Sequence, residues 1–317
     1  MKLKKGSYPH YYTGLKFFKI VKPDMINNED TELIYSKVFC QHNDIIYSIT
    51  TPVYNQEDII VENIKSIIEN TVENFELLII LDFCFDNTEK NILEYLDNYK
   101  NDVKNFIKIQ VFKNKNKPLF ETKCDNIGFK NSVGKYCLEI QADMKMTEYG
   151  YNIHLTKPFH LYSNVIAVSG RCAHNLFSAG GIGKLGCSIE KKIVELGICK
   201  NKFYVYETCN RGPLLIDRKK LEELNYLDEV NYFLDDSDHD LMARAFLEKN
   251  YICGYVPIDF HAPIHLGSIR NNKTYNDCES YRINKNEKER LKKLHSNVLR
   301  QKYMKLWNTK EPIFYDI

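Results

Sequence analysis

Short apolar runs and stretches with apolar residues at helical spacing alternate along the first half of the chain. The apolar runs predict buried strands at 45–51, 75–81, 107–112 and 136–140. Helical spacing between these runs predicts amphipathic helices, the first through Ile60, Ile64, Ile67 and Ile68, and further ones over 90–99 and 124–132. Continuous apolar strands that alternate with helices are typical of a mostly parallel sheet with right-handed crossovers. The pattern therefore predicts an α/β fold.

The second half of the chain is less regular. It predicts a strand at 165–169, a loop entering a strand over 210–217, and a helix over 218–224. The acidic run 234–240 leads into a helix whose apolar positions predict a buried side with Leu241, Met242, Ala245 and Phe246. The glycine-rich stretch 178–187 favours a lid or surface loop, and the basic stretch 286–307 favours a packing helix.

Composition narrows the class of protein. The chain has 317 residues, enough for a large core, and its 44 basic and 42 acidic residues give a net charge of +2. This balance provides no strong field for a nucleic acid partner. No apolar run is long enough to span a membrane, and the N-terminus lacks an apolar signal core. Ten cysteines without CxxC spacing argue for reduced thiols and against a zinc site, so we expect a cytoplasmic protein.

Three of the predicted strands are followed by polar loops. These loops lie at 51–55, at Asp82 and at 141–143. Because ligands bind outside the carboxyl ends of strands in open α/β sheets, these loops predict a nucleotide-sized site. Asp143 can hold a divalent cation against a phosphate, although it can also cap the following turn. Neither GxGxxG nor GxxxxGK[ST] is present after the first strand, which argues against a dinucleotide site or a P-loop.

Several motifs occur in an order that resembles the GT-A fold glycosyltransferases of the family 2 type. They are Thr51-Pro52-Val53-Tyr54-Asn55, Asp82 with Asp86-Asn87-Thr88, Asn126-x-Gly128 with Ser132-x-Gly134-x-Tyr136 leading into Gln141-Ala142-Asp143, and Asp238-x-Asp240-Leu241 with Arg244. The resemblance covers about residues 45–146 and extends through the last motif to about residue 270. It implies a GT-A domain over 45–270, with a nucleotide-binding half over 45–146 and an acceptor half over 147–270. Residues 1–44 are expected to be an N-terminal extension packed on the core, and 271–317 a C-terminal helical extension.

The resemblance also implies a chemistry. A sugar would pass from a nucleotide-sugar donor to an acceptor hydroxyl, with inversion of the anomeric carbon and with assistance from Mn²⁺ or Mg²⁺. The donor would be a UDP-sugar, because Asp82 and the TPVYN loop resemble the family's uracil-binding site. The residues expected at the donor are Thr51, Pro52, Val53, Tyr54, Asn55, Asp82, Asn126, Gln141, Ala142, Asp143 and Arg211. Asp143 and His265 would bind the metal, with His261 as the substitute for His265. Asp238 would be the general base, and Arg211 with Gly212 would line the acceptor side.

The motifs depart from the family pattern at named positions. Gln141 replaces the first Asp of the DxD motif, Lys145 adds a positive charge nearby, and Ser237 stands where the family often has Glu. For Asp238 the alternatives are a helix cap, or the base role falling to Asp236 or Asp240. Other classes considered are a nucleotidyltransferase, a carboxylate-pair glycoside hydrolase and a non-catalytic sugar-nucleotide-binding module. The motifs do not distinguish among glycan, protein and small-molecule acceptors.

Overall fold

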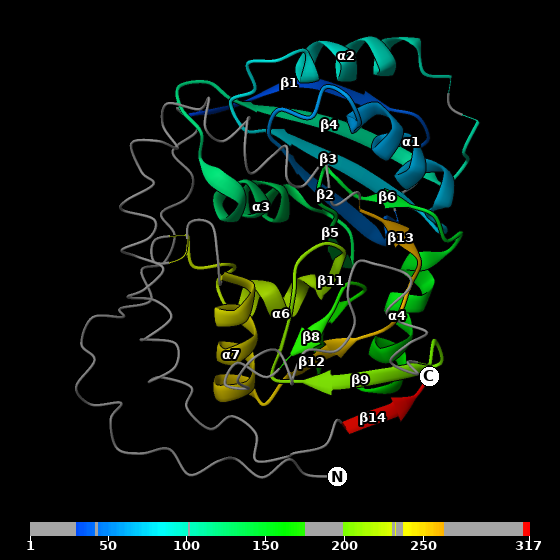
Figure 1. The fold of residues 1–317 in the computed structure, drawn as a ribbon, viewed down its shortest axis with the longest axis vertical. Helices are drawn as coiled ribbons and strands as arrows, with labels where there is room; N and C mark the ends of the chain where they lie inside the picture. The colour runs from blue at the N-terminus through cyan, green and yellow to red at the C-terminus, as the bar shows by residue number, and fades with distance from the viewer. Residues whose placement is uncertain are drawn as a thin grey trace, which may run out of the picture.

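A ten-stranded sheet forms the centre of the molecule, with the strand order β1-β4-β3-β2-β5-β11-β7-β12-β9-β14 (Figure 1). The computed structural model describes residues 30–41, 44–100, 102–174, 199–229, 232, 237–262 and 313–317. The strands of this sheet are β1 (Thr31–Val38), β2 (Tyr47–Val53), β3 (Phe75–Leu81), β4 (Phe106–Asn114), β5 (Tyr136–Glu139), β7 (Val165–Ser169), β9 (Lys202–Tyr206), β11 (Leu214–Asp217), β12 (Ile252–Tyr255) and β14 (Ile313–Asp316). Short pairs form from β6 (Lys145–Met146) with β13 (Phe260–His261) and from β8 (Ala173–His174) with β10 (Thr208–Cys209).

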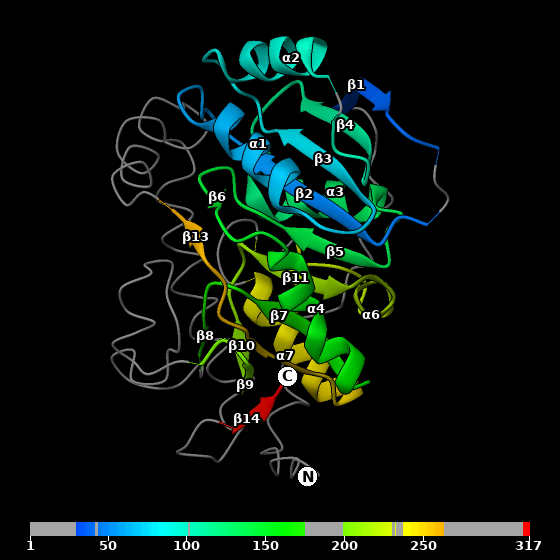
Figure 2. The same ribbon diagram turned by 90° about the vertical axis from the view of Figure 1, so that its right-hand side faces the viewer.

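Helices cover both faces of the sheet, which confirms the predicted α/β class (Figures 1 and 2). The helices are α1 (Ile60–Asn70), α2 (Thr88–Asn98), α3 (Phe120–Asn131), α4 (Tyr151–Leu161), α6 (Arg218–Glu223) and α7 (Ser237–Lys249). Alternate side chains of β3 enter different cores because successive residues of a strand face opposite sides. Leu77 and Ile79 join the core under α1, whereas Leu78 and Ile80 pack with α3.

Strand directions fix which loops share an edge. β4, β3, β2 and β5 are parallel, as predicted. β11 runs antiparallel to both β5 and β7, so the whole sheet is mixed rather than mostly parallel. Because of that double reversal, β7 has the same direction as β5. The carboxyl ends of β2, β3, β5 and β7 therefore lie at one edge of the sheet, and the predicted site loops gather there.

Two predicted boundaries were wrong for identifiable reasons. The first strand was expected to stop at Pro52, but β2 continues to Val53. Pairing with β5 ends at Thr50, so Pro52 has only β3 beside it and a missing N–H is tolerated there. The helix predicted over 124–132 begins earlier, at Phe120, because Asp82 accepts hydrogen bonds from the N–H groups of Leu119 and Phe120.

α3 packs very closely on β2. A Cβ atom added to Gly128 would lie 2.2 Å from Cγ2 of Thr50, so no larger residue fits at this crossing without displacing the helix. The start of α3 lies at the site edge of the sheet, where Asp82 after β3 accepts from the Leu119 and Phe120 N–H groups.

Several predictions concern residues outside the described ranges. They are the loop at 178–187, the helix at 286–307, His265, Asp236 and most of both proposed extensions. Within the first extension, residues 31–38 form β1, an edge strand that the sequence analysis did not predict. The domain boundaries remain predictions. None of the helices in the described ranges is long and apolar enough to cross a membrane.

Candidate active site

The loops after β2 and β3 are joined by side-chain contacts. Asn55 has a positive φ of 46°, and its Oδ1 accepts a hydrogen bond from the Phe85 N–H at 3.0 Å. The Tyr54 and Phe85 rings meet edge to face, with centroids 6.2 Å apart. Of the other predicted residues in this loop, Thr51 and Val53 are buried and Pro52 is half-buried. The structure thus brings the predicted TPVYN loop beside the loop that follows Asp82.

Asp82 is committed to internal hydrogen bonds. Its Oδ1 accepts from Asn114 Nδ2 at 2.8 Å and from the Leu119 N–H at 2.6 Å, and its Oδ2 accepts from the Phe120 N–H at 2.9 Å. Burial raises the pKa of Asp82, although these donors act in the opposite direction. Asp82 thus stabilises the start of α3, and recognition of a nucleobase by its carboxylate remains a prediction.

The segment after β5 is pinned by side chains from other elements. Gln141 Nε2 donates to Glu121 Oε1 at 2.6 Å, and Arg171 Nη1 donates to Gln141 Oε1 at 3.3 Å. Asn63 Nδ2 of α1 donates to the Ala142 carbonyl. Asp143, which follows, is buried at the same edge of the sheet. The tip predicted from the QAD motif is therefore held in place from both faces.

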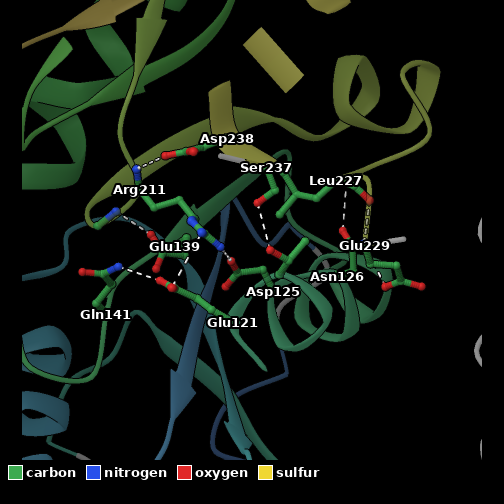
Figure 3. Close-up of polar contacts among 12 residues, drawn as sticks. Glu121, Asp125, Asn126, Glu139, Gln141, Arg211, Leu227, Glu229, Ser237 and Asp238 are labelled. Carbon is green, nitrogen blue, oxygen red and sulfur yellow. Dashed lines mark hydrogen bonds and ion pairs between the residues drawn. The ribbon is translucent and has the colours of Figure 1, made fainter. Parts of the chain in front are cut away.

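A cluster of carboxylates surrounds Arg211, which lies between β10 and β11 (Figure 3). Arg211 Nη1 donates to Asp125 Oδ2 at 2.9 Å, and Nη2 lies 3.6 Å from Glu121 Oε2. The next residue, Gly212, donates its N–H to Glu139 Oε2 at 2.5 Å. We call Glu121, Asp125, Glu139 and Asp238 with Arg211 the Arg211 cluster; its members other than Glu121 are buried.

The members of the Arg211 cluster differ in how readily they ionise. Burial and the neighbouring Asp125 and Glu121 carboxylates raise the pKa of Glu139 well above its ordinary value, despite the opposing charge of Arg211. Burial likewise raises the pKa of Asp125 to about 7, again against the attraction of Arg211. Glu139 Oε1 and Asp125 Oδ1 are buried and accept no hydrogen bond from any residue in the described ranges. Glu139 therefore favours the protonated form near neutral pH, whereas Asp125 is present there in both forms, the ionised one paired with Arg211.

Asp238 behaves differently. Its Oδ2 accepts from the Arg211 backbone N–H at 3.0 Å and its Oδ1 from the His239 N–H at 2.9 Å. Burial would raise its pKa, but the His239 and Arg211 charges together with these two donors lower it below the ordinary value. Asp238 is thus a buried carboxylate that stays ionised at the N-terminus of α7, as a general base requires.

Asp240, the alternative base, has a structural partner. Its Oδ2 accepts from Arg244 Nε at 2.7 Å, and the same guanidinium donates to the Leu224 and Tyr226 carbonyls. Asp240 therefore orients an arginine that ties α7 to the end of α6. This arrangement favours Asp238 over Asp240 for the base role.

The hydrogen bonds of Asn126 in the described residues do not reach the predicted nucleotide-sugar site. Its Nδ2 donates to the Leu227 carbonyl at 2.9 Å and to Glu229 Oε2 at 3.1 Å, and its Oδ1 accepts from the Leu227 N–H at 3.1 Å. These contacts tie α3 to the segment after α6. Donor binding by Asn126 stays a prediction that no contact here supports.

Among the described residues, the predicted metal site depends on Asp143. Within the described ranges no group of at least three His, Cys, Asp or Glu side chains could hold a metal ion. Asp143 offers one buried carboxylate, and His261 is exposed on β13, opposite Lys145 of β6. A single carboxylate fits a cation whose other ligands are diphosphate oxygens and water, which is the usual arrangement for Mg²⁺ on nucleotides. His265 lies outside the described residues.

Sequence reasoning missed several members of the site. Glu121 and Asp125 are four positions apart and therefore share one face of α3, a signal that the predicted helix start at 124 concealed. Glu139 is a carboxylate inside an otherwise apolar run, which was a usable signal. His239 and Arg171 carry no pattern that distinguishes them. Their partners lie in other segments of the chain, so only the fold brings them to the site.

Residues 48–151 match the sequence model of glycosyl transferase family 2. The match contains every motif named above except the one at Asp238. An uncharacterized glycosyltransferase of Rickettsia conorii, RC0461, is 36% identical over 101 residues, covering 32% of this chain and 15% of that protein. The likeness to this relative thus covers about a third of this chain and a small part of the relative.

Solved structures extend the comparison to the fold. GalNAc-T7 with UDP, GalNAc and Mn²⁺ is similar with a TM-score of 0.52 and 15% identity, over 70% of this chain and 44% of that one. S. aureus TarS 1–349 in complex with UDP gives a TM-score of 0.49 at 15% identity, over 69% of this chain and 60% of that one. The chain has the GT-A fold, as predicted.

Proposed function

We propose that the protein is a glycosyltransferase that moves a sugar from a UDP-sugar to an acceptor hydroxyl with inversion, assisted by a divalent cation. The observation that carries the proposal is the state of Asp238. It is a buried, ionised carboxylate held by the Arg211 and His239 N–H groups, at the edge of the sheet where the TPVYN loop and Asp143 also lie. The family 2 match over 48–151 supports the reaction class.

Asp238 would act as the general base. It would take the proton of the acceptor hydroxyl as the oxygen attacks the anomeric carbon, while the bond from that carbon to the diphosphate breaks. Direct displacement inverts the anomeric carbon, and the electron pair leaves with the diphosphate. The low pKa of Asp238 keeps the carboxylate ionised at neutral pH, and its two backbone donors fix its orientation.

Asp143 would hold the cation, which would neutralise charge that grows on the leaving diphosphate. GalNAc-T7, a structural neighbour with the same fold, was solved with UDP, GalNAc and Mn²⁺, which supports a nucleotide-sugar donor and a metal at a general level. The loops after β2 and β3, tied together by Asn55 and Phe85, would receive the nucleoside.

Thermal-shift screening of UDP- and GDP-sugars, with and without Mn²⁺, tests donor binding, because a ligand that binds only the folded state raises the melting temperature. Nucleotide release should then be measured against panels of glycan, protein and small-molecule acceptors. We expect a UDP-sugar to stabilise the protein and an acceptor to increase UDP release. Stabilisation without turnover on any acceptor would instead support a sugar-nucleotide-binding module. Reducing sugar released without a nucleotide donor would support a hydrolase.

A further inference from the structure

Arg171 occupies an unusual position among the cations at the site edge. It lies just beyond the carboxyl end of β7, which runs in the direction of β5, and its side chain reaches Gln141. The other cations nearby face carboxylates. Lys145 Nζ lies 3.1 Å from Glu62 Oε2, and Arg211 lies beside Asp125 and Glu121. Within the described ranges, the side-chain hydrogen bond of Arg171 is to a neutral amide and no carboxylate pairs with it.

The side-chain amide of Gln141 links the carboxylate of Glu121 to the guanidinium of Arg171. Its Nε2 donates to Glu121 Oε1 while its Oε1 accepts from Arg171 Nη1. An aspartate at this position could accept from Arg171 but could not donate to Glu121, and two carboxylates would then face each other. The amide therefore orients the Arg171 guanidinium without neutralising its charge.

The charge and the geometry of Arg171 match an anion. A guanidinium carries five N–H donors in a planar fork, which suits the paired oxygens of phosphate groups. Arg171 is only half-buried, so a ligand can reach it, and Gln141 occupies one of its donors. An anionic ligand would supply the counter-charge that the described residues do not give Arg171.

We propose that Arg171, oriented by Gln141, binds the diphosphate of the nucleotide donor. This inference rests on the proposed function. It also gives a reason for glutamine at position 141: Arg171 would supply part of the positive charge that a metal ion, held more tightly by a second carboxylate, would otherwise bring to the diphosphate. The donor should accordingly bind without a divalent cation, more weakly than with one.

The test compares ligands with and without phosphate. Binding of UDP, by calorimetry, and of uridine, by NMR titration, should be measured in EDTA for the wild type and for Arg171→Gln. We expect the variant to lose roughly ten- to a hundredfold in UDP affinity, the scale of hydrogen bonds to charged groups, and to bind uridine unchanged. Arg171→Lys should recover part of the UDP affinity, because it restores the charge without the fork.

Lys219→Gln is the matched control. Lys219 is an exposed cation on α6, which follows β11 at the opposite edge of the sheet. Its loss changes the net charge equally and should leave UDP affinity unaltered. UDP affinity unchanged in Arg171→Gln, or an equal loss of UDP and uridine binding, would overturn the inference alone. A wild type that binds neither UDP nor GDP would overturn the proposed function, and this inference with it.

Discussion

The backbone N–H of Arg211 donates to Oδ2 of Asp238 at 3.0 Å across 27 positions of the sequence. The Arg211 side chain meanwhile lies among Asp125 and Glu121 of α3. One residue therefore places the loop before β11, the first turn of α7 and the first turns of α3 relative to one another. The proposed base is held by a backbone group whose own position depends on a buried ion pair.

Asp238→Asn separates catalysis from helix capping. Asparagine accepts backbone hydrogen bonds almost as well as aspartate but does not act as a base at neutral pH. We expect a variant that melts near the wild type, binds UDP-sugar normally and loses about a hundredfold or more in kcat, the scale of a general base.

Asp240→Asn is the comparison for this variant. Because Asp240 pairs with Arg244, its replacement should lower the melting temperature more and kcat less than Asp238→Asn. Asp236→Asn should also lose less turnover than Asp238→Asn. A dead Asp240→Asn beside an active Asp238→Asn would assign the base role to Asp240.

The pH dependence of stability should report on the Arg211 cluster. Asp125 has its pKa raised by burial to about 7, so its folded form holds a proton that the unfolded chain loses near pH 4. The stability that this proton contributes is present below about pH 4 and is lost as the pH rises through about 7. We expect the melting temperature of Asp125→Asn to fall less than that of the wild type between pH 5 and pH 8.

Asp238 contributes in the opposite direction. Its pKa is lowered in the folded state, so its contribution is present above the pKa of the unfolded chain and is lost only as the pH falls through the lower folded value. Asp238 therefore does not change the stability between pH 5 and pH 8.

Asp102→Asn is the control for Asp125→Asn. Asp102 is exposed, so the melting temperature of this variant should follow that of the wild type. Parallel melting curves for wild type and Asp125→Asn would contradict the assignment.

Gly212→Ala should impair both folding and turnover. Gly212 has a φ of +62°, and an added Cβ would lie 2.7 Å from Gln141 Cγ. We expect a loss of about 1–3 kcal/mol in the free energy of unfolding, measured by urea denaturation, because strain and a clash coincide. Turnover should fall as well, since the neighbouring Arg211 N–H holds Asp238.

Gly150→Ala provides the matched control for that substitution. Gly150 has a similar φ of +75°, but among the described residues a Cβ there would meet only Val72 Cγ2, at an ordinary 3.6 Å. It should show the strain of a positive φ alone, about 1 kcal/mol, with normal turnover. Equal effects of the two substitutions on kcat would mean that the Gly212 loop does not control the site.

Asp143→Ala should abolish the effect of the metal on the nucleotide. In the wild type we expect Mn²⁺ to tighten UDP binding in calorimetry, with Mg²⁺ as a substitute. The variant should bind UDP equally with and without the cation. Glu62→Ala removes an exposed carboxylate close by on α1 and should keep the full metal response. A metal titration unchanged in Asp143→Ala would remove that residue from the cation site.

The sequence by itself determined most elements between residues 45 and 140 and the edge at which the site lies, but it gave no sign of β1, α4, β9, β12 or β14. Apolar periodicity located β3 and β7 at their observed bounds and placed the buried side of α7 correctly. A buried strand or helix face needs apolar neighbours but not particular ones. The local pattern of apolar residues is therefore sufficient to predict these features. The polar residues after the strands likewise indicated the site, since parallel strands end at a common edge.

Only the tertiary structure decided which charges meet. The apolar run around Glu139 indicated its burial, but not the carboxylates beside it or Arg211, which lies more than seventy positions away along the chain. Burial raises the pKa of Asp125 against the attraction of the same distant Arg211, and no local pattern indicated either effect. The capping of α3 by Asp82 and the contact of Arg171 with Gln141 are also long-range. Electrostatic interactions act through space and grow stronger with burial. The distances between these charged groups in the folded protein cannot be predicted from the spacing of the residues along the chain.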